Sequence, residues 1–119
     1  MLKMKLLYSL AVLLVLMSCN SGQSASNANS NTEGERLFTT NCASCHKCDI
    51  NFTGPALKGA VSRWKDKGLM YEFIRNPMGV IMKDEYAAGL QKKFNAIMTP
   101  STLTNEQIDA VLEYCNNSQ

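Results

Sequence analysis

Cys42, Cys45 and His46 are the residues of this chain whose types and spacing point most directly to a defined chemistry. Two thiols three positions apart, followed at once by the only histidine of the chain, form the pattern through which haem is attached covalently. Each thiol adds across one vinyl group of the porphyrin, so two thioether bonds fix one edge of the macrocycle along a short turn. His46 is then presented to the iron as a neutral imidazole ligand. The motif predicts one covalent haem.

A structural zinc site and a redox dithiol are the other chemistries that two cysteines at this spacing support. Zinc needs four ligands, and Cys42, Cys45, His46 and Cys48 supply that number. These four lie within seven residues, and His46 directly follows Cys45, so closing one tetrahedron from all of them would be strained. Haem is therefore the favoured interpretation.

The second axial ligand of such an iron decides whether the haem carries electrons or binds a small molecule. No second histidine exists, and a methionine thioether is the natural candidate. Met70 falls on the apolar face of a predicted helix, where core packing is the better explanation. Met78 and Met82 fall between predicted helices. Met98 is the strongest candidate, because it lies in a predicted loop that can aim its side chain at the iron.

Arg63 and Trp64 are candidate hydrogen-bond donors to the haem propionates. A guanidinium and an indole N–H both suit a carboxylate that is partly buried. The alternative is that Trp64 only packs and that Arg63 is solvated, and the sequence leaves both interpretations open.

The N-terminus has the features of an export signal. Lys3 and Lys5 precede an apolar stretch that is too short to span a bilayer as a stable helix. It ends at Leu16-Met17-Ser18-Cys19, which resembles the bacterial lipobox, so we expect a signal peptide over residues 1–18 and lipidation at Cys19. An ordinary secretory signal with an incidental Cys19 is the alternative. Asn20 after the cysteine favours transport to the outer membrane, with the protein facing the periplasm.

The mature chain divides into a tether and one domain. Residues 19–31 are small and polar, which predicts a flexible linker, and residues 32–119 form a single domain. Without Lys3 and Lys5 the formal charge of +2 falls to zero, and nothing indicates binding to nucleic acid. An exported domain can keep disulfides, so Cys48 and Cys115 are a candidate bridge, with burial of Cys115 as a small apolar residue as the alternative.

Helical patterns cover the domain, and no alternating strand pattern of useful length occurs. Thr32 with Glu35, and Thr104 with Gln107, are capping-box pairs that predict the starts of the first and last helices. Gly34 in the first of these helices suggests close approach of another helix. Residues 68–76 and 84–96 predict two shorter helices, with loops over 51–62 and 97–103. The sequence therefore predicts an all-α domain.

Residues 32–119 resemble a class I c-type cytochrome, and in particular a small monohaem electron-transfer lipoprotein. Gly34 and Phe38 match the first helix of that family, which crosses the last helix near an aromatic that Tyr114 supplies. The segment 54–57 resembles the one whose proline carbonyl accepts a hydrogen bond from the proximal imidazole, which implies that role for Pro55. Met98-Thr-Pro resembles the distal loop, although Thr99 separates the methionine from its usual proline.

The resemblance implies a compact cytochrome c fold, in which the N- and C-terminal helices cross and two shorter helices lie between them. It implies a monomeric one-electron carrier with one haem c held by His46 and Met98, and not an enzyme. The expected partners are redox proteins at the membrane: a quinol-oxidising complex, a terminal oxidase or a reductase. A gas sensor or catalytic haem with an open sixth site is the alternative.

Overall fold

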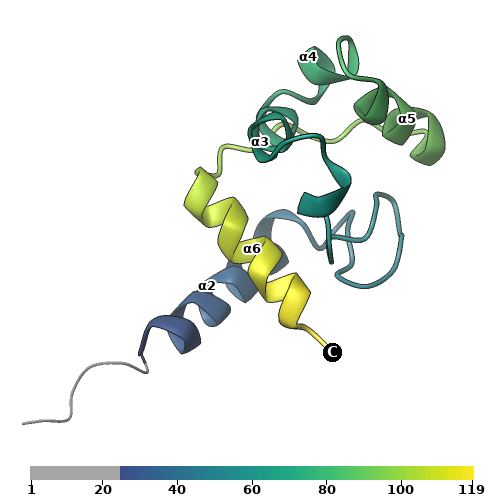
Figure 1. Ribbon diagram of the computed structural model, residues 1–119. Coiled ribbons are helices and arrows are strands. Elements are labelled where there is room, and N and C mark those ends of the chain that lie inside the picture. The colour runs from purple at the N-terminus through teal and green to yellow at the C-terminus, as the bar shows by residue number, and fades with distance from the viewer. Residues whose placement is uncertain (1–24) are drawn as a thin grey trace, which may run out of the picture.

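The computed structural model describes residues 25–119, with side chains from residue 31 onward, and all regular elements in that range are helical. In chain order they are α2 (Ala25–Asn41), the 3₁₀ helix η1 (Val61–Arg63), α3 (Lys67–Arg75), α4 (Pro77–Ile81), α5 (Glu85–Phe94) and α6 (Asn105–Asn117). Figure 1 shows α2 and α6 crossing at one end of the domain, with α3, α4 and α5 at the other. The predicted all-α fold is confirmed.

The crossing of α2 and α6 depends on Gly34. A Cβ atom built at this glycine would lie 2.2 Å from the carbonyl oxygen of Ala110 and 2.9 Å from the Cβ of Tyr114. Only a residue without a side chain allows the two helix backbones to come so close. The predicted close approach is therefore confirmed, and the rings of Phe38 and Tyr114 pack beside it at a centroid distance of 5.7 Å.

The start of α2 differs from the prediction. The helix begins at Ala25, so Thr32 stands inside it rather than at its N-cap, and residues 25–31 of the predicted flexible linker are helical. Once a helix has nucleated, each further residue adds a hydrogen bond at modest cost, and alanine, asparagine and serine can all extend it. Residues 19–24 of that linker, the signal peptide 1–18 and Cys19 lie outside the described residues.

The last helix begins where its sequence predicts. The Thr104 hydroxyl accepts a hydrogen bond from the backbone N–H of Gln107, and the Gln107 side-chain oxygen accepts one from the backbone N–H of Thr104. This capping box satisfies two backbone donors that the helix itself leaves unpaired. Four residues of α6 are buried, and they face α2 and α3: Ile108, Val111, Leu112 and Cys115.

The shorter helices are started by side-chain caps. Asp66 accepts a hydrogen bond from the N–H of Leu69 at the start of α3, and Asp84 accepts one from the N–H of Ala87 at the start of α5. α3 begins and ends one residue before the predicted range 68–76, and α5 lies inside the predicted range 84–96. α5 ends at Phe94, and its C-cap residue Asn95 adopts the left-handed conformation with φ of 49°.

α4 is an additional short helix that the sequence patterns did not predict. Asn76 caps it by accepting a hydrogen bond from the N–H of Gly79, and Pro77 occupies its first position, where the missing N–H does no harm. A helix of five residues is too short to show a helical period, which explains why the segment resembled a loop. No helix of the described part of the chain is long and apolar enough to cross a membrane.

Candidate haem site

The attachment motif forms a tight turn at the end of α2. The N–H groups of Cys42 and Ala43 donate to the carbonyl of Phe38 at 2.8 and 2.9 Å, and the N–H groups of Cys45 and His46 donate to the carbonyl of Cys42 at 3.1 and 2.8 Å. Cys42 and Cys45 are unbridged, and Cys45 is exposed. Burial raises the pKa of the Cys42 thiol to about 11. The turn therefore presents two thiols and His46 within one short segment.

Two backbone contacts orient the imidazole of His46. Its Nδ1 lies 2.8 Å from the carbonyl oxygen of Pro55, so in the tautomer protonated at Nδ1 it donates to that oxygen and leaves Nε2 free to bind a metal. A Cβ atom at Gly54 would lie 2.4 Å from the imidazole Cε1, so this glycine lets the backbone press against the ring. The N–H of Gly54 donates to the carbonyl of Cys45 at 2.8 Å. The structure thus places Pro55 where its predicted role requires it.

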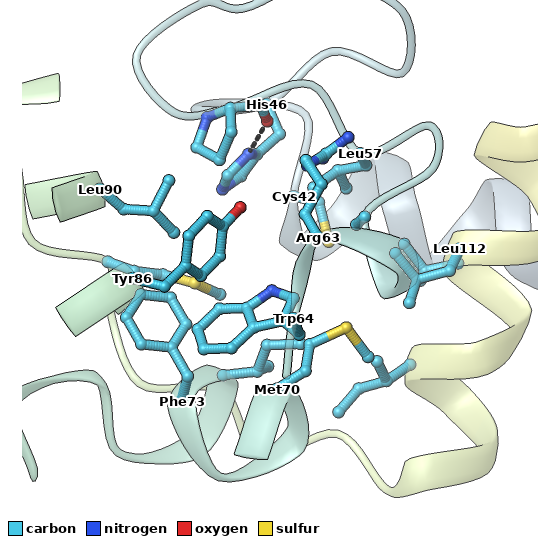
Figure 2. Close-up of a pocket in the computed structure, with 16 residues that line it drawn as sticks. Cys42, His46, Leu57, Arg63, Trp64, Met70, Phe73, Tyr86, Leu90 and Leu112 are labelled. Atoms are coloured by element: carbon cyan, nitrogen blue, oxygen red, sulfur yellow. Dashed lines mark hydrogen bonds between the residues drawn. The ribbon is translucent and has the colours of Figure 1, made fainter. Parts of the chain in front are cut away.

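Two adjoining cavities, with empty volumes of about 670 and 1090 Å³ including space open to solvent, flank His46. They share part of their lining, so they form one continuous crevice; the shared residues are Cys42, His46, Pro55, Phe73, Leu90 and Met98. Figure 2 shows the smaller cavity, which lies between His46 on one side and the side chains of Phe73, Trp64 and Met70 on the other. A largely apolar crevice with two thiols at one edge fits a porphyrin.

The four candidate methionines are separated by their positions. Met98 lies in a non-helical segment and lines both cavities together with His46. Met70 lines only the smaller cavity and is 1% exposed, packed with Ala60, Ile108 and Leu112 as predicted for a core residue. Met78 and Met82 are 46% and 82% exposed and line neither cavity. Of these four, Met98 is the one that the fold brings to the crevice from a loop.

Arg63 and Trp64 both line the smaller cavity, as a role beside the haem requires. Arg63 donates to the carbonyl of Lys58 at 2.8 Å and also to the carbonyl of Ala56, which holds the guanidinium at the rim. The Trp64 ring packs against Phe73 and Tyr86, each at a centroid distance of 5.0 Å. Trp64 therefore packs and also lines the cavity, so the two interpretations of this residue are compatible.

Tyr86 is a cavity residue whose hydroxyl group no sequence pattern points to. Figure 2 shows its hydroxyl pointing into the cavity toward the region of His46 and Cys42. At the sequence level this tyrosine sits among the apolar positions of a predicted helix. Tyr86 lies one helical turn before Leu90, so the two side chains share one face of the helix, and Leu90 also lines the cavity. This shared face was the sequence signal that could have placed Tyr86 at the cavity.

Cys48 and Cys115 are joined by a disulfide, with their Cα atoms 4.8 Å apart. The bridge connects the segment just after His46 to α6, where Cys115 is fully buried. Because Cys48 is bridged, the four-ligand set considered for zinc is not available. In the described part of the chain, no group of three or more histidine, cysteine or acidic side chains comes together to hold a metal ion.

Comparisons with known proteins agree on one family. A family model described as cytochrome c matches residues 32–119. Among solved structures, cytochrome c from Rhodothermus marinus is 31% identical with a TM-score of 0.63, and the match covers 83% of this chain and 84% of that one. An engineered form of it, Rma TDE, is 30% identical with a TM-score of 0.61, covering 83% and 85%.

The same engineered cytochrome in a complex with a carbene intermediate is also 30% identical, with a TM-score of 0.57 and coverage of 83% and 85%. Among curated proteins none matches the chain.

Proposed function

The chain belongs to the cytochrome c family, and we propose that it carries single electrons through a haem whose iron is bound by His46 and Met98. Membership of this family implies one covalently bound haem c with its iron, and the general role of the family is electron transfer. The observation that supports Met98 as the second ligand is its place in a loop that lines both cavities together with His46.

The haem, when bound, supplies the one-electron chemistry, and the protein residues bind and orient it. Cys42 and Cys45 would hold it through thioethers. The Nδ1–H group of His46 is held by the Pro55 carbonyl, so the ring cannot rotate without losing that hydrogen bond. Arg63 and Trp64, with their N–H donors at the smaller cavity, would bind propionate oxygens.

The segment that carries Met98 is held by the C-terminal end of α3. The N–H of Ser101 donates to the carbonyl of Ile74 at 2.9 Å, and the Arg75 side chain donates to the carbonyl of Leu103 at 3.2 Å. The N–H of Leu103 donates to the Ser101 hydroxyl at 3.2 Å. These contacts fix the loop after Met98, so the thioether reaches the crevice from a positioned backbone.

Retention of both axial ligands in both oxidation states suits an electron carrier. If His46 and Met98 both stay bound, the coordination would change little when the electron is transferred, so little reorganisation would oppose the transfer. A soft thioether ligand stabilises ferrous iron, and the apolar lining of the crevice disfavours the extra charge of the ferric state. We therefore expect a relatively high reduction potential.

Replacement of Met98 by alanine tests the ligand assignment. We expect the variant to lose the weak absorption near the red end of the ferric spectrum that marks sulfur bound to iron, and to show a lower reduction potential. Met82→Ala is the matched control, because Met82 is 82% exposed and lines neither cavity. An unaltered low-spin spectrum in Met98→Ala would show that another group is the ligand.

A second function, with a displaceable sixth ligand, has one observation in its favour. A structure of the engineered relative is described as bound to a carbene intermediate. In this chain His46 directly follows Cys45 and its Nδ1 lies 2.8 Å from the Pro55 carbonyl oxygen, so Met98 is the ligand that can leave more easily. Carbon monoxide added to the reduced wild-type protein separates the two functions: a carrier keeps its spectrum, whereas a sensor or catalytic haem changes it.

We further propose that the chain is exported, lipidated at Cys19 and anchored to a bacterial membrane facing the periplasm, with the outer membrane favoured. Its partners would be a quinol-oxidising complex, a terminal oxidase or a reductase. Metabolic labelling with a fatty acid tests the anchor, and a Cys19→Ala variant should lose the label. Reoxidation of the reduced protein by isolated oxidases tests the partners.

A further inference from the structure

The attachment motif contains two overlapping pairs of cysteines with the same spacing. Cys42 and Cys45 form one pair, and Cys45 and Cys48 form the other, with His46 and Lys47 between them. Only the first pair is followed directly by a histidine. Thioether formation requires a free thiol near a vinyl group, and the spacing alone does not distinguish the pairs. A free thiol at Cys48 would therefore compete for the porphyrin, or for Cys45.

The structure separates these three thiols. Cys48 is joined to Cys115, with a Cα–Cα distance of 4.8 Å that lies within the usual range for a disulfide, while Cys42 and Cys45 stay unbridged. Cys42 and Cys48 both pack against the same buried cluster, which consists of Leu37, Phe38, Val111 and Cys115. Cys48 is thus near the reacting thiols but is already bonded to α6.

The cluster that holds the bridge is mostly independent of the haem crevice. Leu37, Phe38 and Cys115 line neither cavity. Hydrogen bonds also hold the segment at Lys58 and Gly59 between Cys48 and α6: the N–H of Lys58 donates to the carbonyl of Cys48 at 2.7 Å, and the N–H of Gly59 donates to the Asn116 side chain of α6 at 2.8 Å. The crossing of α2 and α6 can therefore bring Cys48 to Cys115 without contacts from the porphyrin.

We propose that the Cys48–Cys115 disulfide directs haem attachment, because it removes Cys48 from the reaction and leaves Cys42 and Cys45 as the only reactive pair of the motif. Forming the bridge removes two protons and two electrons from the thiols and passes them to a disulfide oxidant, which becomes a dithiol. Each thioether then forms when an S–H group adds across a vinyl group. A C–S and a C–H bond replace the S–H and π bonds, and no electrons leave.

This inference rests on covalent haem attachment and on export to an oxidising compartment, so its test uses the full chain, exported in cells that attach haem. Cys115→Ala and Cys48→Ala are a matched pair, because both lose the bridge and only Cys115→Ala keeps the competing thiol. The double variant loses the bridge and the competitor together. Trypsin cleaves after Lys47, so peptide masses show whether haem is bound to residues 37–47 or to residues 48–58.

We expect wild type, Cys48→Ala and the double variant to carry haem only on residues 37–47. Cys115→Ala should yield peptides 37–47 and 48–58 linked through haem or through a Cys45–Cys48 disulfide. If the overlapping pairs compete equally, the correctly attached product falls about two-fold. Correct attachment in Cys115→Ala would overturn the proposal, and so would a loss of correct attachment in Cys48→Ala equal to that in Cys115→Ala. Wild type without any haem would contradict the proposed function instead.

Discussion

The two sides of the haem crevice are built differently. The side that carries the attachment motif and His46 rests on the α2–α6 crossing, where Leu37, Phe38, Val111 and Cys115 are buried and a disulfide connects the segment after His46 to α6. The side that carries Met98 rests on short helices and a loop, and α4 and α5 together bury only Pro77, Val80 and Ala87. Figure 1 shows α2 and α6 at one end of the domain, and α4 and α5 at the other.

This difference suits a carrier that must never lose its haem but must keep one edge of the crevice accessible. The haem links at Cys42 and Cys45 and the His46 ligand need a fixed backbone, and the long-range contacts of α2 and α6 supply it. Met98, as the proposed second ligand, needs only to be aimed, and a loop tied to Ile74 and Arg75 of α3 can achieve this. We therefore expect the Met98 side to open before the His46 side when the protein is stressed.

Removal of the disulfide is the change with the largest expected effect on this comparison. The bridge closes a loop with a sequence separation of 67 residues, and the chain-entropy relation gives about 4 kcal/mol for a loop of that length. The double variant Cys48→Ala/Cys115→Ala should lose stability of that order in urea unfolding followed by circular dichroism. A loss below about 1 kcal/mol would show that the bridge is not what stiffens the His46 side.

A pair of glycine substitutions should give opposite results on the two sides. A Cβ at Gly34 would lie 2.2 Å from the Ala110 carbonyl oxygen, so Gly34→Ala should push α2 from α6 and destabilise the protein by about 1–3 kcal/mol. A Cβ at Gly89 in α5 meets nothing within 4 Å, so Gly89→Ala should stabilise by about 0.5–1 kcal/mol.

Thermal unfolding of the two glycine variants beside wild type is a sufficient measurement. The two substitutions add the same methyl group to a helix, so helix propensity cancels between them and the difference reports packing alone. Equal shifts of the midpoint, in either direction, would mean that the α2–α6 crossing is no tighter than the surroundings of α5.

Cap substitutions give the smallest expected effects, and they compare the two ends of the domain one helix at a time. Thr104→Ala removes the cap of α6 and Asp84→Ala removes the cap of α5, and each should cost about 1 kcal/mol. The Asp84 variant should lose the sulfur-to-iron absorption at lower urea than the helical circular dichroism. In the Thr104 variant the split between the two signals should be smaller, and a split there as large as in the Asp84 variant would contradict the account.

Features encoded by a few neighbouring residues were predictable from the sequence. The Thr104–Gln107 capping box, the end of α3 before Pro77 and the cysteine pair with its histidine each act within a few residues of chain, and the structure contains the predicted helices. Gly34 was also informative, since a glycine that weakens a helix usually has a packing reason. The resemblance to cytochromes c added Pro55, which the structure places 2.8 Å from His46.

Features that depend on distant packing were not predictable in the same way. The capping pattern of Thr32 predicts the start of α2 at that residue, yet the helix begins at Ala25. α4 is too short to show a period, and Tyr86 has the same spacing as an apolar core residue. The candidate pair Cys48 and Cys115 could be named, but whether they meet depends on the α2–α6 crossing.

X-ray absorption at the iron edge of the haem-loaded protein tests the central claim most directly, because it counts the atoms bound to iron in each oxidation state. The account predicts one sulfur and one imidazole nitrogen as axial ligands in both the ferric and the ferrous protein, with the sulfur lost in Met98→Ala. An iron without a bound sulfur in either state, or a sulfur that persists in the Met98 variant, would contradict it.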